Sequence, residues 1–338
     1  MWAPGKPRDA GDRHHGNMKG TWWNREGGSM RAMVIREFGG PEVFEQREMP
    51  DPRPDPDQVL VEVKATSINP VDFKTRQRGG WDIRPPAVLG WDAAGVVREA
   101  GSRVTGLMPG DEVFYTPPID GRGTYAELHA VPAGVVATKP SNLTFQEAAA
   151  VPLAGSTAWD ALIERCRVLP GERVLIHGAG GVGSLGIQLA RAAGAWVAVT
   201  CGDYDFDLVG ELGAELAIDY RNQDFTRVLD PESVDVVFDT VGGDLLARSA
   251  PLVKPGGRMA VIVQHGGDFG RAYHRNLTLH MVLLSRSRRK MELLRNLIEW
   301  GRLRPVIDSV MDLAEVAEAH RRLEKGRVRG KIVIRVQD

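Results

Sequence analysis

The chain has 338 residues, of which 43% are hydrophobic and 26% charged, a composition typical of a soluble globular protein with room for two domains. A formal net charge of −1 argues against nucleic acid or a membrane surface as the main partner, and no apolar run approaches the roughly 18 residues of a membrane span. Two cysteines are too few for a disulfide scaffold or a four-cysteine zinc lobe, which favours a reduced, cytoplasmic setting.

Residues 1–29 are rich in Gly, Arg and Asp and lack an apolar core. We therefore predict a flexible N-terminal extension and no secretory signal. Met30 opens the first strand-like run and is a candidate for the biological start. His14 and His15 could bind a metal, but a tail without structure is the favoured interpretation.

Residues 30–152 are expected to form a β-rich domain, because short apolar or alternating runs are separated there by Gly and Pro. The predicted strands cover residues 33–38, 59–68, 94–99, 112–115, 124–132 and 135–138. Within the second run, Val59, Val61 and Val63 face the core and Leu60 faces away. Four prolines between positions 50 and 56 exclude regular structure between the first two strands. Such a turn-rich array is typical of a partly open barrel or a sandwich.

From about residue 145 the pattern changes to alternating helices and strands, starting with a helical segment over 145–166. The predicted strands cover residues 174–176, 196–200, 216–218, 234–238 and 258–263, and helices lie near 183–193, 206–212 and 244–252. This alternation predicts an α/β domain with a doubly wound parallel sheet over residues 153–284. Ligands of such sheets bind at the carboxyl ends of the strands.

Residues 285–338 combine helices over 287–300 and 313–323 with strands over 306–310 and 331–336. A finished doubly wound sheet has no place for these strands, so we expect them to return to the β-rich domain. The segment opens with a basic run over 286–290, whose cations oppose the dipole at a helix start. A solvated face is the favoured interpretation, and an anion-binding or interface role is the alternative.

Glycines follow the strand over 174–176 in the pattern Gly178-x-Gly180-x-x-Gly183, and a helix comes next. A dinucleotide pyrophosphate needs such a turn: one glycine bends the chain, one lets the phosphates approach, and one lets helix and strand pack closely. The N–H groups and the positive dipole end of the helix face the anion. We therefore predict a dinucleotide site that includes Gly181 and Val182. A glycine turn without a ligand is the alternative.

Other stretches have equally distinctive sequences: Ser67-Ile-Asn-Pro-Val-Asp72, Leu89-Gly-Trp-Asp-Ala-Ala-Gly95, Pro109-Gly-Asp-Glu-Val113, Gly123-Thr-Tyr-Ala-Glu127, Gly155-Ser-Thr-Ala-Trp159, Phe238-Asp-Thr-Val-Gly-Gly243 and Gly330-Lys-Ile-Val-Ile334. With them, the chain resembles the medium-chain dehydrogenase/reductase superfamily, in its zinc-free quinone oxidoreductase (zeta-crystallin-like) branch. The resemblance implies a GroES-like catalytic domain over 30–152, a Rossmann cofactor domain over 153–284 and a return of 285–338 to the catalytic domain. It also implies a homodimer or tetramer, in which a strand near 277–284 extends the sheet across subunits.

Zinc-dependent members of the superfamily carry a catalytic cysteine where this chain resembles them over residues 69–72, and Gly-His-Glu where it has Gly-Trp-Asp at 90–92. No cysteine precedes Cys166, so we expect no metal. The donors that could in principle assemble are Asp72, Asp92, Asp111 and His129. Such an oxygen-rich set favours harder ions than zinc.

Without a Lewis acid, alcohol oxidation lacks an obvious stabiliser for the alkoxide. Transfer of hydride from a reduced nicotinamide to a small quinone or α,β-unsaturated carbonyl is easier, because these acceptors take hydride directly. The resemblance places Asn69 beside the nicotinamide, and Asp72 and Tyr125 are further catalytic candidates. A simple turn is an equally good role for Asn69. The other two, like the pocket candidates Trp91 and Tyr115, could be ordinary core or cap residues.

The resemblance also assigns residues to the two halves of the cofactor. Those for the nicotinamide half are Thr240, Val241, Val263 and Gln264, with Thr157 and Lys331 as weaker candidates. Those for the adenosine half are Thr200, Tyr204 and Tyr220. Thr200 lies at the tip of the second strand, where NAD sites usually place an acid and where a small neutral residue leaves room for a 2′-phosphate.

The charged residues that follow this strand favour NAD(H) over NADP(H). Asp203, Asp205 and Asp207 follow it, and no base appears before Arg221. Uncompensated acids disfavour a phosphate and so favour NAD(H). The resemblance favours NADP(H), which we retain because the strand tip itself lacks the acid.

The leading hypothesis is therefore an NADPH-dependent quinone or enone reductase. An alcohol dehydrogenase of the same fold, or a crystallin-like nucleotide-binding protein without turnover, are the alternatives. The acceptor is not readable from the expected substrate loops over 116–122 and 266–275.

Overall fold

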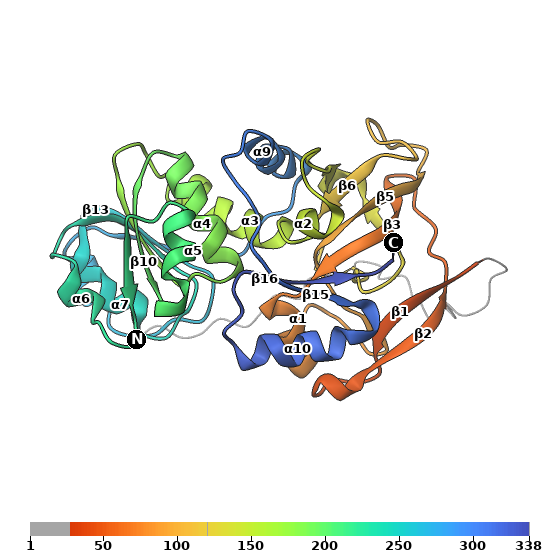
Figure 1. Ribbon diagram of the computed structural model, residues 1–338, viewed down its shortest axis with the longest axis horizontal. Helices are drawn as coiled ribbons and strands as arrows, with labels where there is room; N and C mark the ends of the chain where they lie inside the picture. Colours follow the sequence, from red (N-terminus) through yellow and green to blue (C-terminus); the bar gives the residue numbers. More distant parts are fainter. Residues whose placement is uncertain (1–27, 120, 338) are drawn as a thin grey trace, which may run out of the picture.

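The computed structural model describes residues 28–119 and 121–337. Two domains lie side by side along the longest axis of the molecule, one α/β and one rich in β-strands (Figure 1). The extension predicted over 1–29, including His14 and His15, lies outside the described residues except for its last two positions. Within the described part of the chain, no helix combines the length and the apolar character needed to cross a bilayer.

The β-rich domain is built on a sheet in the order β15-β16-β3-β5-β6-β8, with β7 added to β3. Its strands are β3 (Gln58–Ser67), β5 (Ala93–Ala100), β6 (Glu112–Tyr115), β7 (Leu128–Pro132), β8 (Val136–Thr138), β15 (Ile307–Asp312) and β16 (Lys331–Arg335). Leu60, predicted to face away from the core, is buried with Met30 and Leu128 in a second small core. The strand β3 therefore packs on both faces.

A smaller sheet, in the order β2-β1-β4, covers this second core. Its strands are β1 (Ser29–Ile35), β2 (Phe44–Pro50) and β4 (Ala87–Val88). The prediction that residues between the first two strands lack regular structure is wrong for 44–50, because β2 pairs antiparallel with the whole of β1. The first proline, Pro50, occupies only the last position of an edge strand, where a missing N–H is tolerated.

A helix that the sequence pattern did not predict, α1 (Pro70–Arg78), begins directly after β3. Asn69 is its N-cap, Pro70 its first residue and Asp72 the third, which closes a capping box with the Asn69 backbone N–H. These are the residue types that start helices. The alternative of a simple turn at Asn69 is thus wrong, and the helix start fixes the position of this side chain.

The α/β domain contains a six-stranded sheet in the order β11-β10-β9-β12-β13-β14, in which every pair is parallel. The strands are β9 (Arg173–His177), β10 (Trp196–Cys201), β11 (Leu216–Asp219), β12 (Val234–Asp239), β13 (Val253–Val261) and β14 (Thr278–Met281). The helices include α3 (Pro152–Trp159), α4 (Gly181–Ala192), α5 (Phe206–Glu211), α6 (Phe225–Val228) and α7 (Leu245–Ser249). The prediction of a doubly wound parallel sheet is confirmed.

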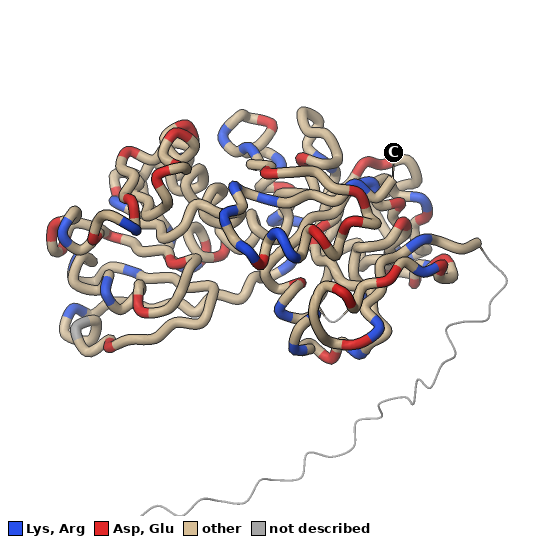
Figure 2. Tube along the Cα trace, turned by 60° about the horizontal axis from the view of Figure 1, so that its bottom comes forward, with Lys and Arg blue, Asp and Glu red and all other residues tan. Residues whose placement is uncertain are grey.

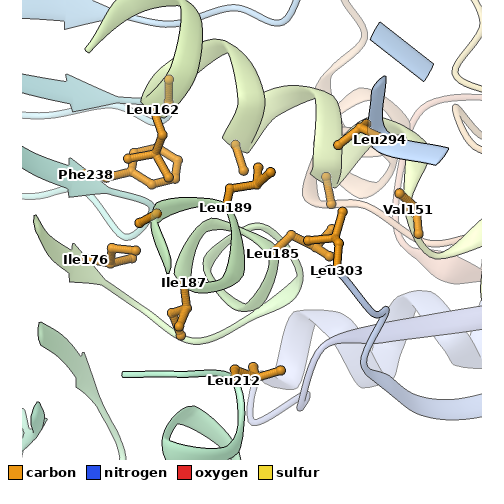
Figure 3. Packing of buried hydrophobic residues seen from close by; sticks show 14 of the residues in the cluster. Val151, Leu162, Ile176, Leu185, Ile187, Leu189, Leu212, Phe238, Leu294 and Leu303 are labelled. Atoms are coloured by element: carbon orange, nitrogen blue, oxygen red, sulfur yellow. The ribbon is translucent and has the colours of Figure 1, made fainter. Parts of the chain in front are cut away.

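The helix α4 is held against the sheet by a buried apolar cluster that includes Ile176, Leu185 and Phe238 (Figure 3). Gly186 lets the Phe238 ring approach, because a Cβ at this position would lie only 3.3 Å from the ring. This packing fixes the N-terminus of α4 at the carboxyl end of β9, where the glycine pattern occurs.

The C-terminal segment crosses back to the β-rich domain. The strand β16 pairs antiparallel with β3 and parallel with β15, so the strands predicted over 306–310 and 331–336 extend the first sheet. The helix α10 (Val316–Lys325) packs beside α1. Between the two domains lie α3 and β16, which are far apart in the sequence (Figure 1).

The basic run over 286–290 opens α9 (Arg288–Glu299), and it is not simply a solvated face. Lys290 is buried and forms an ion pair with the buried Asp160. Ser285 donates to the same carboxylate, and Arg288 donates to the carbonyl of Gly106 in the β-rich domain. The favoured interpretation is thus wrong for Lys290, whose ion pair joins the crossover segment to the α/β domain.

Candidate active site

The glycine turn has the geometry that a pyrophosphate requires. Gly178 has φ +93°, a conformation that side chains disfavour. A Cβ on Gly183 would lie 2.0 Å from the carbonyl oxygen of Gly178, so strand and helix approach too closely for any other residue. A Cβ on Gly180, by contrast, would meet no atom within 4 Å. Gly180 therefore borders open space at the N-terminus of α4, where the dipole favours an anion.

The open space predicts opposite results for two substitutions. In Gly180→Ala the methyl group projects into the predicted ligand space, so folding should be unchanged while a dinucleotide should bind about tenfold more weakly. In Gly183→Ala the methyl group meets the backbone, so unfolding should become easier by about 1–3 kcal/mol. Thermal unfolding and titration of NADPH by fluorescence measure the two effects. Equal binding by Gly180→Ala and wild type would place the pyrophosphate elsewhere.

A cavity of about 440 Å³ continues from this turn along the carboxyl ends of β9, β10 and β11. The predicted residues that line it are Gly178, Gly180, Thr200, Tyr204, Tyr220 and Val241. The sequence reasoning missed Phe225, Arg248, Arg327 and Val328, which also line it. Arg327 comes from the loop between α10 and β16, so both domains form this groove. Its glycine floor suits the pyrophosphate and its position suits the adenosine half of a dinucleotide, whereas Asn69, Thr157, Thr240, Val263, Gln264 and Lys331 do not line it.

The sequence suggested that the acids after β10 have no basic partner, but arginines lie beside Asp203 and Asp205. Arg221 lies 3.8 Å from Asp203 and its guanidinium lies over the rings of Tyr204 and Tyr220, at 5.2 and 5.3 Å from their centroids. Asp205 is buried and pairs at 3.0 Å with Arg329. Burial raises the pKa of Asp205 and this arginine opposes the shift. Basic residues gather at the junction of the two domains (Figure 2).

At the other end of the site, Asn69 belongs to a buried polar network. Its Nδ2 donates to Asp92 at 2.7 Å, and its Oδ1 accepts from Lys331 Nζ at 2.5 Å. Lys331 also donates to the carbonyl of Ile68 and forms an ion pair with Asp92 at 3.2 Å. Asp92 accepts two further bonds, from the Ser67 hydroxyl and the Leu153 backbone N–H.

The two charged neighbours fix the orientation of the Asn69 amide. Lys331 can only donate and an ionised Asp92 can only accept, so Oδ1 must face the lysine and the NH₂ group the carboxylate. The amide keeps one N–H that makes no hydrogen bond to any described residue. Asn69 is therefore held as a hydrogen-bond donor.

Asp72 and Tyr125 meet behind Asn69. Tyr125 Oη donates to Asp72 Oδ2 at 2.5 Å, and that oxygen also accepts the Asn69 backbone N–H. Burial raises the pKa of Asp72 to about 7, and that of Tyr125 well above its ordinary value. His320 Nε2 lies 3.3 Å from Tyr125 Oη, and Arg76 donates to the other ring nitrogen. Through the bond from the Asn69 backbone N–H to Asp72, this network holds Asn69 in position.

The other predicted residues have more local roles. Thr240 donates its hydroxyl to the carbonyl of His177 at 2.7 Å, and Thr157 donates to Leu153 within its own helix. Val263 and Gln264 follow β13, where the Gln264 carbonyl accepts from Gly243. Trp91 and Tyr115, considered for the pocket, are wholly buried core residues. Gly181 packs against the Lys331 side chain, and Val182 lies in the first turn of α4.

The donors considered for a metal are engaged separately. His129 is bonded to Tyr115 and to the carbonyl of Arg122, and Asp111 accepts from the Met108 backbone. Among the described residues, no group of three or more His, Cys, Asp and Glu side chains is arranged to hold a metal ion. Where zinc-dependent members have a histidine, Trp91 offers only an N–H, so the residues present do not fit zinc.

Comparisons with known proteins agree with this architecture. The family model described as "Alcohol dehydrogenase GroES-like domain" matches residues 55–141, and the one described as "Zinc-binding dehydrogenase" matches residues 212–334. The 2-methylene-furan-3-one reductase of Solanum lycopersicum is 38% identical over 319 residues, which cover 90% of this chain and 79% of that protein. The chloroplastic NADPH-dependent alkenal/one oxidoreductase of Arabidopsis thaliana is 35% identical with the same coverage.

Among solved structures, a quinone oxidoreductase from Coxiella burnetii superimposes with a TM-score of 0.84 at 33% identity, over 92% of this chain and 100% of that chain. The chain therefore belongs to the medium-chain dehydrogenase/reductase superfamily. Within it, the chain falls in the quinone oxidoreductase branch and is an NAD(P)H-dependent oxidoreductase. The resemblance drawn from the motifs is confirmed.

Proposed function

We propose that the protein is a zinc-independent, NADPH-dependent cytoplasmic reductase that transfers hydride to a small quinone or an α,β-unsaturated carbonyl. The observation that carries the proposal is the orientation of Asn69, which the Asp92–Lys331 pair holds as a hydrogen-bond donor. Asn69 lies in the stretch 69–72, over which the resemblance places a catalytic cysteine in zinc-dependent members. The relatives named above as enone and quinone reductases support the same class of substrate.

The reduced nicotinamide supplies the hydride, and the protein supplies position and polarity. The free N–H of Asn69 can donate to a substrate oxygen that gains negative charge, or to a ribose hydroxyl beside it. The glycine turn binds the pyrophosphate and so sets the reach of the cofactor. The buried bonds from Asp72 and Tyr125 hold the start of α1 and keep Asn69 in place.

NADPH is favoured over NADH because arginines line the groove and lie beside the acids that follow β10. Arg221 stands over Tyr204 and Tyr220 beside the β10 tip, and Arg327 lines the same cavity. The pairing of Asp205 with Arg329 removes one of the acids that argued for NADH. A charge-assisted bond to the 2′-phosphate would outweigh the exposed Asp203.

Arg221→Ala tests this preference. We expect the dissociation constant for NADPH to rise about tenfold, because a charge-assisted hydrogen bond is lost, while that for NADH stays within about twofold. Isothermal titration with both dinucleotides measures the ratio. Arg227→Ala, which removes an exposed arginine from the neighbouring α6, is the matched control. An unchanged ratio in Arg221→Ala would assign the phosphate to other residues.

The proposed activity is tested by oxidation of NADPH and NADH with a simple quinone and a simple enone, each with and without a chelator. Fast turnover of NADPH that the chelator does not affect is the expected result. Turnover abolished by the chelator would point to a metal-dependent alcohol dehydrogenase. Dinucleotide binding without turnover of any acceptor would point to the crystallin-like alternative.

We also propose a homodimer formed through β14, the last strand of the six-stranded sheet. Only β13 pairs with β14 among the described strands, and Met281 and the nearby Leu283 are well exposed. An unpaired edge strand with apolar neighbours is a ready surface for a second sheet. Light scattering tests the assembly, and a monomeric mass would contradict it.

A further inference from the structure

His177, the last residue of β9, has both ring nitrogens bonded to hydroxyl groups. Nδ1 lies 2.9 Å from Thr200 Oγ1 at the end of β10, and Nε2 lies 2.8 Å from Ser249 Oγ in α7. The ring is wholly buried, and burial lowers its pKa to about 3, so it carries a single proton at neutral pH. A neutral imidazole has two tautomers, and each fixes the direction of both hydrogen bonds.

The remaining bonds choose between the tautomers. Ser249 Oγ donates to the carbonyl of Leu245 at 2.8 Å. A hydroxyl has one proton, so Ser249 must accept from His177, whose proton is then on Nε2. Nδ1 is left as an acceptor and takes the hydroxyl proton of Thr200. Thr200 therefore has only lone pairs left to offer a ligand.

The direction of the Thr200 hydrogen bond affects a ligand, because Thr200 lies at the groove. It lines the groove together with Gly178 and Tyr220, while His177 lies beneath the floor. Phe225, which also lines the groove, packs edge-on against the His177 ring at 4.8 Å. Lone pairs on Thr200 suit a ribose hydroxyl, which donates. They repel a phosphate oxygen, which can only accept.

The chain of bonds can reverse without moving a heavy atom. If Ser249 donates to Nε2 instead of to Leu245, the histidine proton moves to Nδ1 and is donated to Thr200. The hydroxyl proton of Thr200 is then free for the groove. The reversed direction suits a phosphate oxygen, and it gives up only the bond from Ser249 to the Leu245 carbonyl.

We propose that Thr200, His177 and Ser249 form a reversible hydrogen-bond relay that lets one site read either the adenosine ribose hydroxyl of NADH or the 2′-phosphate of NADPH. The relay at rest is set for the hydroxyl by Ser249, and a bound phosphate reverses it. His177 and Ser249 are positioning residues, because they act on the cofactor only through Thr200. The inference rests on the proposed function, since it takes the groove to hold a nicotinamide dinucleotide.

The relay is tested first by the tautomer of His177. In wild-type protein labelled with ¹⁵N-histidine, the ring nitrogens report which of them carries the proton. We expect the proton on Nε2 in the free protein and with NAD⁺, and on Nδ1 with NADP⁺. The same tautomer in all three states would overturn the relay. This measurement needs no variant, so it stands even if substitutions impair folding.

The second test is the substitution Ser249→Ala, which removes the group that sets the resting direction without touching the groove. The ratio of the dissociation constants for NADH and NADPH should rise about three- to tenfold, the effect of one hydrogen bond. In Thr200→Val/Ser249→Ala that rise should disappear, because the hydroxyl that reads the cofactor is gone. Ser233→Ala, at a partly buried serine with a buried hydroxyl just before β12, is the matched control and should leave the ratio unchanged.

The outcomes separate the relay from the proposed function. A ratio in Ser249→Ala equal to that of wild type, with both dinucleotides still bound, would refute the relay and leave the reductase in place. Failure of wild-type protein to bind either dinucleotide would refute the proposed function itself. A rise that persists in Thr200→Val/Ser249→Ala would mean that Ser249 acts by another route and would also refute the relay.

Discussion

Replacement of Lys331 by methionine is expected to lower the free energy of unfolding by about 3–5 kcal/mol and to remove most of the turnover. The substitution leaves the Asp92 carboxylate wholly buried without its cation, and breaking one side of a buried pair has costs of this size. It also removes the donor that fixes Asn69 Oδ1, so the amide is free to turn. Urea unfolding and the kcat of the folded variant measure the two effects.

Two further variants separate the network from a simple loss of charge. Lys254→Met breaks the partly exposed pair with Asp235, and it should lower stability by less than about 1 kcal/mol. Asp92→Asn/Lys331→Met removes both charges, so it should recover much of the stability lost in Lys331→Met but not the turnover. If Lys331→Met and Lys254→Met lowered the free energy of unfolding equally, the buried pair would stabilise the protein no more than the partly exposed one.

Acid is expected to destabilise the protein steeply between pH 6.5 and 4. Burial lowers the pKa of His129 to about 4 and that of His177 and His320 to about 3, against an ordinary value of 6.5. The unfolded chain therefore binds protons in this window that the native protein does not. The three buried histidines therefore contribute fully to stability above pH 6.5. This contribution is lost as the pH falls towards the pKa values that they have in the folded protein.

Asp72 acts in the opposite direction, because its pKa is raised to about 7 and the native protein holds an extra proton between pH 4 and 7. Each proton corresponds to about 1.4 kcal/mol per pH unit. Three histidines less one carboxyl leave a net slope of about 2.5 kcal/mol per pH unit near pH 5. Urea unfolding at pH 7.5, 6 and 5 gives the slope directly.

His129→Phe should reduce this slope by about 1.2 kcal/mol per pH unit, because one buried histidine no longer takes up a proton on unfolding. His274→Phe, at an exposed position, is the control and should leave it unchanged. A wild-type slope near zero would contradict the lowered pKa values of these buried rings.

The order of the elements could be predicted because it depends on local signals. The signals were runs that alternate with a period of two residues, glycines and prolines at turns, and the glycine turn at Gly178. Each signal lies within a few neighbouring residues, so the doubly wound sheet could be predicted from them. The predictions that failed depended on distant partners. The strand β2 forms along β1 despite the neighbouring prolines, and Leu60 is buried only because a second sheet covers it.

The residues of the candidate site also fall into those that a local sequence signal marks and those that depend on distant parts of the chain. Asn69 and the glycines could be proposed as site residues from the sequence because short runs of consecutive residues mark them. Other groups of the candidate site come from far along the chain: Arg327 lines the groove, Arg329 pairs with Asp205, and His320 reaches Tyr125. No local pattern marks these residues. The capping signal Asn-Pro-x-Asp at 69–72 was readable and would have predicted α1.

The return of β16 to β3 makes the α/β domain an insertion within the catalytic one, and this has a consequence for synthesis. During translation, the inserted domain is complete once residue 284 has left the ribosome. The β-rich domain must wait until β16 (Lys331–Arg335) has also emerged, and until then the β3 edge that Val333 covers stays open. A nascent chain with an open strand edge is prone to aggregate, so the pairing of β16 with β3 protects the first sheet by covering that edge.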